Sequence, residues 1–237
     1  MNQDRLPRIT NEISKVLAFL DSKAQESILH TEYSLVIAKF NQIDLEEKIA
    51  ILTVCTSALS DEQLNKHQAI RITAVRVIVA LLPMSLGTIV ELLNRRLNRY
   101  DYETHFTLFC YLDWVQEMPD SSSLAKAVLS LVEDYLMTVP RRTARAAWMA
   151  ADMLGSHWNE QEALPLLIKT VQGAKHSVGR LGSLLGLGKV LNRLPIESNA
   201  YKHLLKTLHQ VSLFDDSKYV KEEARTLIDH PGKLSKR

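Results

Sequence analysis

The chain has 237 residues, of which 46% are hydrophobic and 24% are charged, so it is long enough to bury a core and too apolar to be disordered. Its 29 Lys and Arg residues against 27 Asp and Glu residues give a net charge of +2, which excludes the composition of a dedicated nucleic-acid coat protein or a polycationic membrane binder. The two cysteines, Cys55 and Cys110, are too few for a disulfide framework or a four-cysteine zinc site, and we expect buried thiols in a reducing compartment.

The ends of the chain and its apolar runs indicate where the protein resides. Asp4, Arg5 and Arg8 are charged and no apolar stretch follows them, so a secretory signal is not expected and a cytoplasmic location is predicted. The most apolar window, 77–84, contains Pro83 and is far shorter than the ~20 residues that span a bilayer. We therefore expect no membrane partner.

Helical periodicity runs through the chain, whereas strand and hairpin signals are almost absent. Apolar residues recur at helical spacing in the segments 9–20, 45–54 and 124–136. Capping residues and prolines interrupt the pattern at Asp21, Asn41, Ser60-Asp61, Pro83, Asp101, Pro119-Asp120, Pro140, His157–Asn159, Pro195 and Asp215-Asp216. The prediction is an all-α protein of roughly twelve helices, with residues 5–41 as a terminal cap and residues 231–237 as a basic, flexible tail.

Four of the expected helices share one internal pattern, in which a small residue stands at the fifth position. The aligned segments are Ile70–Ile78, Thr143–Ala151, Val178–Gly186 and Val220–Ile228, with a weaker copy at His105, Phe109 and Leu112. Successive starts are 73, 35 and 42 residues apart, and the first interval is about two periods. A small fifth residue lets each helix approach its neighbour closely.

This pattern resembles the HEAT repeat family of armadillo-like proteins. Residues 163–168 (Ala-Leu-Pro-Leu-Leu-Ile) are similar to the proline-bearing first helix of a HEAT unit, and residues 145–155 are similar to the second helix of the preceding unit. The resemblance is strongest over residues 140–192. It implies a right-handed α-α superhelix of about six helix pairs, in which residues 1–230 form one domain with a concave binding surface, and it implies no particular reaction.

Four glycines, Gly179, Gly182, Gly186 and Gly188, invite comparison with a phosphate-binding loop. Their spacing does not fit, because Lys189 is followed by Val190 rather than by Ser or Thr. The glycines also lie within a helical apolar pattern, so close helix packing is the favoured interpretation.

Catalytic and metal-binding patterns are missing from the sequence. His203 and His209 are six residues apart, which does not fit a helical zinc site, and no Gly-x-Ser-x-Gly motif occurs. The serines at 121–123 stand where a helix begins and are explained by capping. We expect a non-enzymatic protein without a cofactor or metal.

Trp148 and Asp152 stand one helical turn apart, with Arg145 beside them, and Asp113-Trp114 occupies the equivalent helix of the preceding unit. An aromatic ring and a carboxylate facing a groove could hold an extruded base, a feature that resembles HEAT-like alkylpurine DNA glycosylases. A nucleic-acid-binding protein of this kind is the alternative function. Packing of the tryptophan in the core or on a helix ridge, and pairing of the aspartate with a nearby arginine, are favoured over it.

The C-terminal half is basic. Residues 119–237 carry 17 basic and 12 acidic side chains, and the excess concentrates between Arg141 and Arg193. The repeat register places Arg145 and Arg180 at equivalent positions of adjacent helices, about 10 Å apart, and Arg142 extends the same face. We predict that Arg142, Arg145 and Arg180 bind an acidic protein or peptide segment, so that the protein acts as a scaffold. Nucleic acid is the second candidate ligand. The alternative interpretation is that these arginines belong to an ordinary solvated helix surface.

Overall fold

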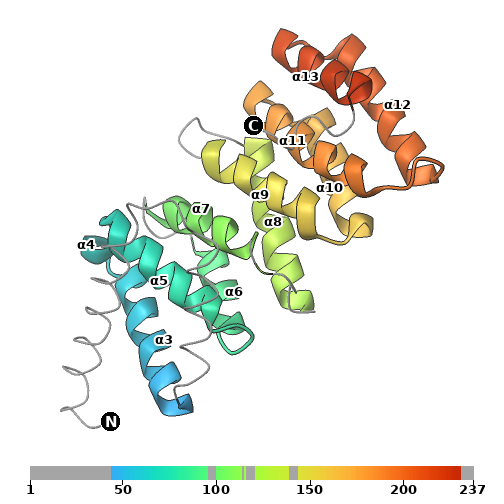
Figure 1. Ribbon diagram of the computed structural model, residues 1–237. Coiled ribbons are helices and arrows are strands. Elements are labelled where there is room, and N and C mark those ends of the chain that lie inside the picture. Colours follow the sequence, from blue (N-terminus) through green and yellow to red (C-terminus); the bar gives the residue numbers. More distant parts are fainter. Residues whose placement is uncertain (1–43, 96–99, 114, 116–120, 139–143, 231–237) are drawn as a thin grey trace. The chain divides into compact units, whose positions relative to one another are not determined.

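The computed structural model describes residues 44–95, 100–113, 115, 121–138 and 144–230 (Figure 1). These residues form eleven α-helices and no strand, which confirms the all-α prediction for this part of the chain. The expected cap at 5–41 and the tail at 231–237 lie outside the described residues. The helices are α3 (Leu45–Ser60), α4 (Glu62–Asn65), α5 (Gln68–Ala80), α6 (Leu86–Asn94), α7 (Asp101–Leu112), α8 (Ser122–Thr138), α9 (Ala144–His157), α10 (Glu160–Gly173), α11 (Ser177–Arg193), α12 (Asn199–Phe214) and α13 (Lys218–Asp229).

Side-chain caps define several helix starts at the positions where the sequence predicts a break. The Asp61 carboxylate accepts from the backbone N–H groups of Gln63 and Leu64, and the Asn159 side chain accepts from Gln161 N–H. At the start of α8, Ser121 Oγ accepts a hydrogen bond from Leu124 N–H at 3.3 Å. These bonds satisfy N–H groups that have no partner within the helix, so capping at Ser121 is confirmed.

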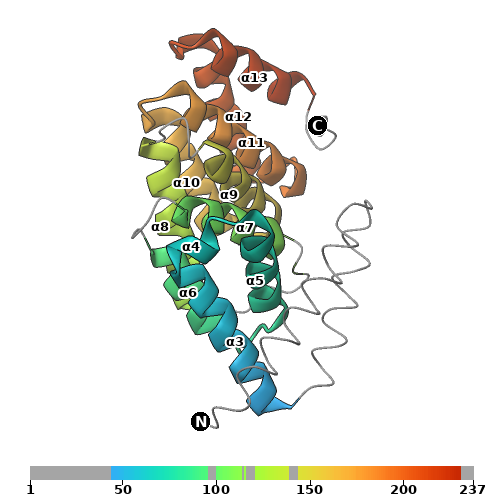
Figure 2. The same ribbon diagram turned by 90° about the vertical axis from the view of Figure 1, so that its left-hand side faces the viewer.

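Contacts divide the chain into two compact units, residues 1–124 and residues 125–237. In the first unit α3 packs against α5, and α5 packs against α7 (Figure 2). Leu59, Ile78, Leu93 and Phe109 are fully buried there. They come from four different helices, so a single apolar core joins the helices of this unit.

In the second unit α11 is the central helix, because it packs against α9, α10 and α13. The pairing of α9 with α11 and of α12 with α13 is visible in Figure 1. Met153, Leu167, Leu187 and Leu208 are completely buried. Each comes from a different helix, so this unit has its own continuous core.

Glycines bring the backbones of α9 and α11 unusually close together. A Cβ atom on Gly155 would lie 2.2 Å from the carbonyl oxygen of Gly186, and one on Gly186 would lie 2.6 Å from the carbonyl oxygen of Ala151. A Cβ on Gly179 would meet the carbonyl oxygen of Leu136 in α8 at 2.0 Å. No side chain fits at these three positions, so the packing interpretation is confirmed for Gly179 and Gly186 of α11.

The small residues at the fifth position of the sequence pattern all lie in the core. Ala74, Ala147, Gly182 and Ala224 are buried. They belong to α5, α9, α11 and α13, so the pattern marks the inward face of four helices.

Two arginines in different units make the same local contact. Arg71 in α5 donates to the carbonyl oxygen of Asn65 at 2.6 Å, and Arg180 in α11 donates to the carbonyl oxygen of Ala174 at 2.8 Å. Each arginine is the fourth residue of its helix and reaches six residues back, Arg71 to the last residue of α4 and Arg180 to the residue that follows α10. This correspondence pairs Arg71 with Arg180, which shifts the sequence-based alignment of α5 and α11 by one residue.

Candidate functional site

The three arginines predicted to form a binding surface have different surroundings. Arg145 is exposed on α9, whereas Arg142 lies outside the described residues. Arg180 is only 8% exposed, because its guanidinium lies between the connection before α11 and the connection after α12. The expectation that Arg180 is a surface residue is therefore wrong.

The Arg180 guanidinium is occupied by groups of its own chain. Its Nε lies 2.8 Å from Oδ2 of Asp215, Nη2 also contacts Asp215 and Asp216, and Nη1 donates to Ala174. The spacing of arginines in the sequence cannot show whether Arg180 forms an internal ion pair or binds a ligand, because Asp215 and Asp216 lie 35 and 36 residues away in the chain. The arrangement joins the start of α11 to the start of α13.

The Trp148 and Asp152 side chains are also engaged within the unit. The Trp148 indole N–H donates to the carbonyl oxygen of Val178 at 2.9 Å, and its ring lies against Gly182. Asp152 forms an ion pair with Lys189 at 3.3 Å. Trp148 is 41% exposed, so one part of its ring faces solvent while the other covers α11. Trp148 is therefore not a core residue but packs on the surface of α11, and Asp152 is ion-paired, with a lysine rather than an arginine as its partner. Trp114 lies outside the described residues.

Most of the other basic residues between 145 and 193 have acceptors nearby. Lys169 contacts Glu133 at 2.5 Å, and Arg193 donates to the carbonyl oxygen of Trp158 at 2.9 Å. Partial burial lowers the pKa of Arg193, and Glu160 opposes this shift. Lys169, Lys189 and Arg180 thus have carboxylates beside them, and Arg193 is bonded to a backbone carbonyl.

A different basic surface lies on α12. Lys202, His203, Lys206 and His209 are all exposed, and the helix from Asn199 to Phe214 contains no acidic residue. Lys202 approaches Glu197 at 3.8 Å, but both side chains are largely exposed and such a pair contributes little. His203 and Lys206 are one turn apart and therefore share one side of the helix. We call these four residues the α12 basic face.

Sequence reasoning considered the histidines of α12 only as metal ligands and missed this surface. The signal that could have found it is compositional, because two lysines and two histidines occur within eight residues without a carboxylate. The helix is also amphipathic, since Leu204, Leu208 and Val211 are buried on one side of it. Polar residues of an amphipathic helix that lie outside the apolar stripe face solvent.

A groove between α10 and α12 adjoins the α12 basic face. It has a volume of about 530 Å³ and is lined by Leu164, Pro165, Ile168, Lys169, Gln172, Gly173 and His203. The lining thus combines apolar residues with one lysine, one histidine and one amide, and it contains no carboxylate.

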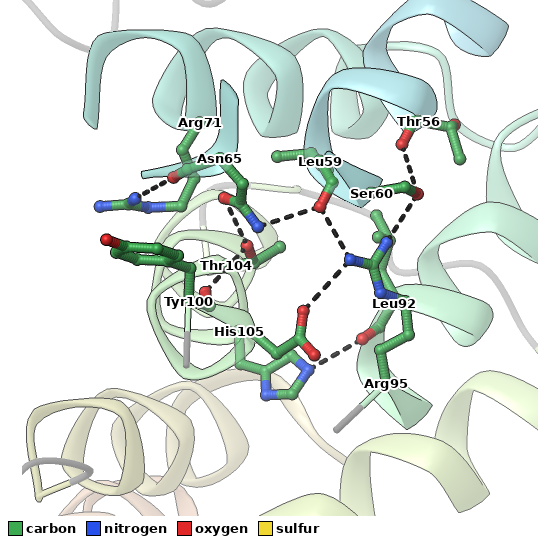
Figure 3. A network of polar contacts seen from close by, with 11 residues as sticks. Thr56, Leu59, Ser60, Asn65, Arg71, Leu92, Arg95, Tyr100, Thr104 and His105 are labelled. Carbon is green, nitrogen blue, oxygen red and sulfur yellow. Dashed lines mark hydrogen bonds and ion pairs between the residues drawn. The ribbon is translucent and has the colours of Figure 1, made fainter. Parts of the chain in front are cut away.

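The first unit contains a buried polar network (Figure 3). Arg95 donates to the carbonyl oxygen of Leu59 at 2.7 Å and contacts Asp101 at 3.2 Å. Asn65 donates to the same carbonyl at 3.0 Å, and His105 Nε2 lies 2.8 Å from the carbonyl oxygen of Leu92. These groups satisfy the carbonyl ends of α3 and α6, so the network holds the helices together rather than presenting groups to a ligand.

Two further arginines of the first unit are likewise engaged internally. The Arg71 guanidinium is 3.7 Å from Glu103, while burial lowers the pKa of Arg71 and Glu103 opposes this shift. Arg76 is buried and its guanidinium lies 5.4 Å from the centre of the Tyr111 ring. Burial raises the pKa of Tyr111, which remains an aromatic partner for the cation.

Two other surface features of the described residues are a groove beside α3 and a group of exposed apolar side chains between α12 and α13. A groove of about 680 Å³ beside α3 is lined by Leu52, Thr53, Thr56, Ser57, Ser60, Asp61 and Thr88. The hydroxyl groups of Thr56 and Ser60 donate to helix carbonyls and the Asp61 carboxylate caps α4, so these polar groups of the lining are engaged within the chain. Leu213, Phe214 and Tyr219 are exposed near the turn between α12 and α13.

Within the described ranges, no group of three or more His, Cys, Asp and Glu side chains is arranged to hold a metal ion. No helix in this part of the chain is both long and apolar enough to cross a membrane. Comparisons of the whole chain with protein-family models, curated proteins and solved structures found no match.

Proposed function

We propose that the chain is a non-enzymatic binding protein that recognises an acidic segment of another protein. The observation that carries this proposal is the α12 basic face, which presents two lysines and two histidines to solvent on a helix without a carboxylate. Positive charge concentrated on one surface attracts a partner of the opposite charge and increases the rate of encounter. Of the three arginines that the sequence suggested, Arg180 is buried, while ligand binding by Arg142 and Arg145 stays a prediction.

We also propose that the helices belong to a HEAT-like, right-handed α-α superhelix of about six helix pairs. The matching contacts of Arg71 and Arg180 support this proposal, because each arginine joins the start of its helix to the end of the helix before it. Repeated helix pairs bury their apolar faces against neighbouring pairs and leave long surfaces for binding. Small-angle X-ray scattering that fits only a closed bundle would contradict the proposal.

Nucleic-acid binding is the competing function. The features that suggested it, Trp148 and Asp152, already bond to Val178 and Lys189 within the second unit. Arg180 is buried and paired with Asp215, so its charge is not available to a phosphate backbone. These contacts favour a protein partner over a nucleic acid.

The experiment is recovery of bound partners on the immobilised full chain at low and high salt, with and without nuclease. Proteins that remain after nuclease treatment, that leave at high salt and that carry acidic segments are the expected result. A Lys202→Glu, Lys206→Glu variant should lose them, whereas the control Lys126→Glu, an exposed lysine on α8, should retain them. Recovery of nucleic acid alone, removed by nuclease, would reject a protein partner.

A further inference from the structure

We propose that the groove between α10 and α12 receives one large apolar side chain of the acidic partner segment, while neighbouring carboxylates of that segment bind the α12 basic face. This inference rests on the proposed function and adds the location and the chemical pattern of the ligand. The occupant is a short segment of another protein in which a leucine-like or aromatic residue is flanked by Asp or Glu. The groove and the basic face lie within the same unit.

The shape of the groove supports the apolar part of this pattern. Leu164, Pro165 and Ile168 provide a hydrocarbon surface on α10, and the volume of about 530 Å³ exceeds that of a single side chain. Leu164 is buried and Ile168 is half-buried, so the floor is formed by residues whose rotamers are restricted by packing. A partner side chain that enters here removes apolar surface of both molecules from water, which is the main source of affinity in a small interface.

The edge of the groove supports the acidic part. Lys169 and His203 are the charged or titratable residues of its lining, and Lys206 follows His203 by one turn on the same side of α12. Lys169 contacts Glu133, but its side chain is 62% exposed, so it can also approach a ligand. A positively charged ligand would lie beside Lys169 and Lys206 and would find no carboxylate in the lining to bind. The groove therefore disfavours positively charged ligands.

The groove does not have the character of a nucleic-acid surface. Such interfaces are much more positively charged than protein interfaces and follow the phosphate backbone with many cations. Here the lining is mostly uncharged and contains one lysine, Lys169, while Lys202 and Lys206 lie beside His203 on α12. A peptide with alternating apolar and acidic residues matches this mixture better than a polyphosphate does.

The test is selection of short random peptides displayed on phage against the intact full chain. The strongest enriched peptide is then synthesised with a fluorescent label, and its Kd is measured by fluorescence anisotropy. Peptides that combine one large apolar residue with several Asp or Glu residues are expected. A labelled DNA duplex serves as a second probe under the same conditions.

Two pairs of variants locate the binding site. Gln172→Trp fills the groove with an exposed, bulky side chain, and Gln161→Trp places the same side chain on an exposed position of α10 that does not line the groove. Lys206→Glu reverses a charge beside the groove, and Lys126→Glu does so on α8. We expect Gln172→Trp and Lys206→Glu to weaken peptide binding by about tenfold or more, while the controls retain it.

The outcomes separate this inference from the proposed function. Acidic peptides whose Kd is unchanged by Gln172→Trp would overturn the groove while leaving an acidic partner in place. Enrichment of peptides without acidic residues, or of none, would overturn both. DNA binding that is as tight as peptide binding and equally sensitive to Gln172→Trp would overturn the choice of a protein partner. Circular dichroism on every variant shows whether it is folded, and Lys206→Glu supplies the test if Gln172→Trp is not.

Discussion

Arg180 and Asp215 form a buried ion pair in which Nε of the arginine lies 2.8 Å from Oδ2 of the aspartate, and their side chains are 9% and 7% exposed. The pair connects α11 with the turn that precedes α13. Arg71 occupies the same helical position in the first unit and reaches Glu103 at 3.7 Å, but Glu103 is far more exposed. Because solvent screens the second pair, the first should contribute more to stability.

Replacement of Arg180 by leucine should lower the free energy of unfolding by about 3 kcal/mol, because it leaves the Asp215 carboxylate buried without its partner. Urea unfolding followed by circular dichroism measures the change. The exposed Lys126 on α8 provides the control, since Lys126→Leu should alter stability by no more than about 0.5 kcal/mol. Equal effects of the two substitutions would contradict a structural role for Arg180.

Replacement of Gly155 by alanine should destabilise the protein by about 1–3 kcal/mol, because the new Cβ would lie 2.2 Å from a backbone oxygen of α11 and the two helices would have to separate. Gly87 in α6 is the matched control, since a Cβ there has no neighbour within 4 Å. Gly87→Ala should raise stability by about 0.5 kcal/mol through the smaller entropy of the unfolded chain. Thermal unfolding distinguishes the two, and loss of stability in both would show that helix contact is not the cause.

Burial raises the pKa of the Cys55 thiol from 9.0 to about 12. The unfolded chain therefore releases this proton at lower pH than the folded protein, so deprotonation favours unfolding. The contribution of Cys55 to stability is complete below pH 9 and is lost progressively between pH 9 and 12. Chemical unfolding over this range should show a smaller decline for Cys55→Ala than for the natural chain, and parallel pH profiles would refute the assignment.

Replacement of Trp148 by phenylalanine should lower the free energy of unfolding by about 1 kcal/mol, because the aromatic ring is kept while the hydrogen bond to the Val178 carbonyl is lost. Denaturant unfolding measures this difference. Tyr219→Phe removes a polar group from an exposed ring in α13 and should have almost no effect. An unchanged stability of Trp148→Phe would indicate that the indole N–H is free to serve a ligand.

Local chemistry made much of the fold predictable from the sequence. Capping residues such as Asn159 and Ser121 begin helices where the sequence indicates, because they satisfy N–H groups only a few residues away. The small residues Ala74, Ala147, Gly182 and Ala224 predicted an inward helix face because periodicity and residue size together determine which side can approach a neighbour.

Interactions between distant segments decided the candidate site. The sequence shows Arg180 as one of several regularly spaced cations, but only the tertiary structure brings Asp215 to its guanidinium and makes it a buried structural residue. Likewise, the α12 basic face is present in the composition, whereas the groove beside His203 arises only where α10 packs against α12. Charge and periodicity are properties of a segment, and burial and ion pairing depend on segments that are far apart in the chain and packed together by the core.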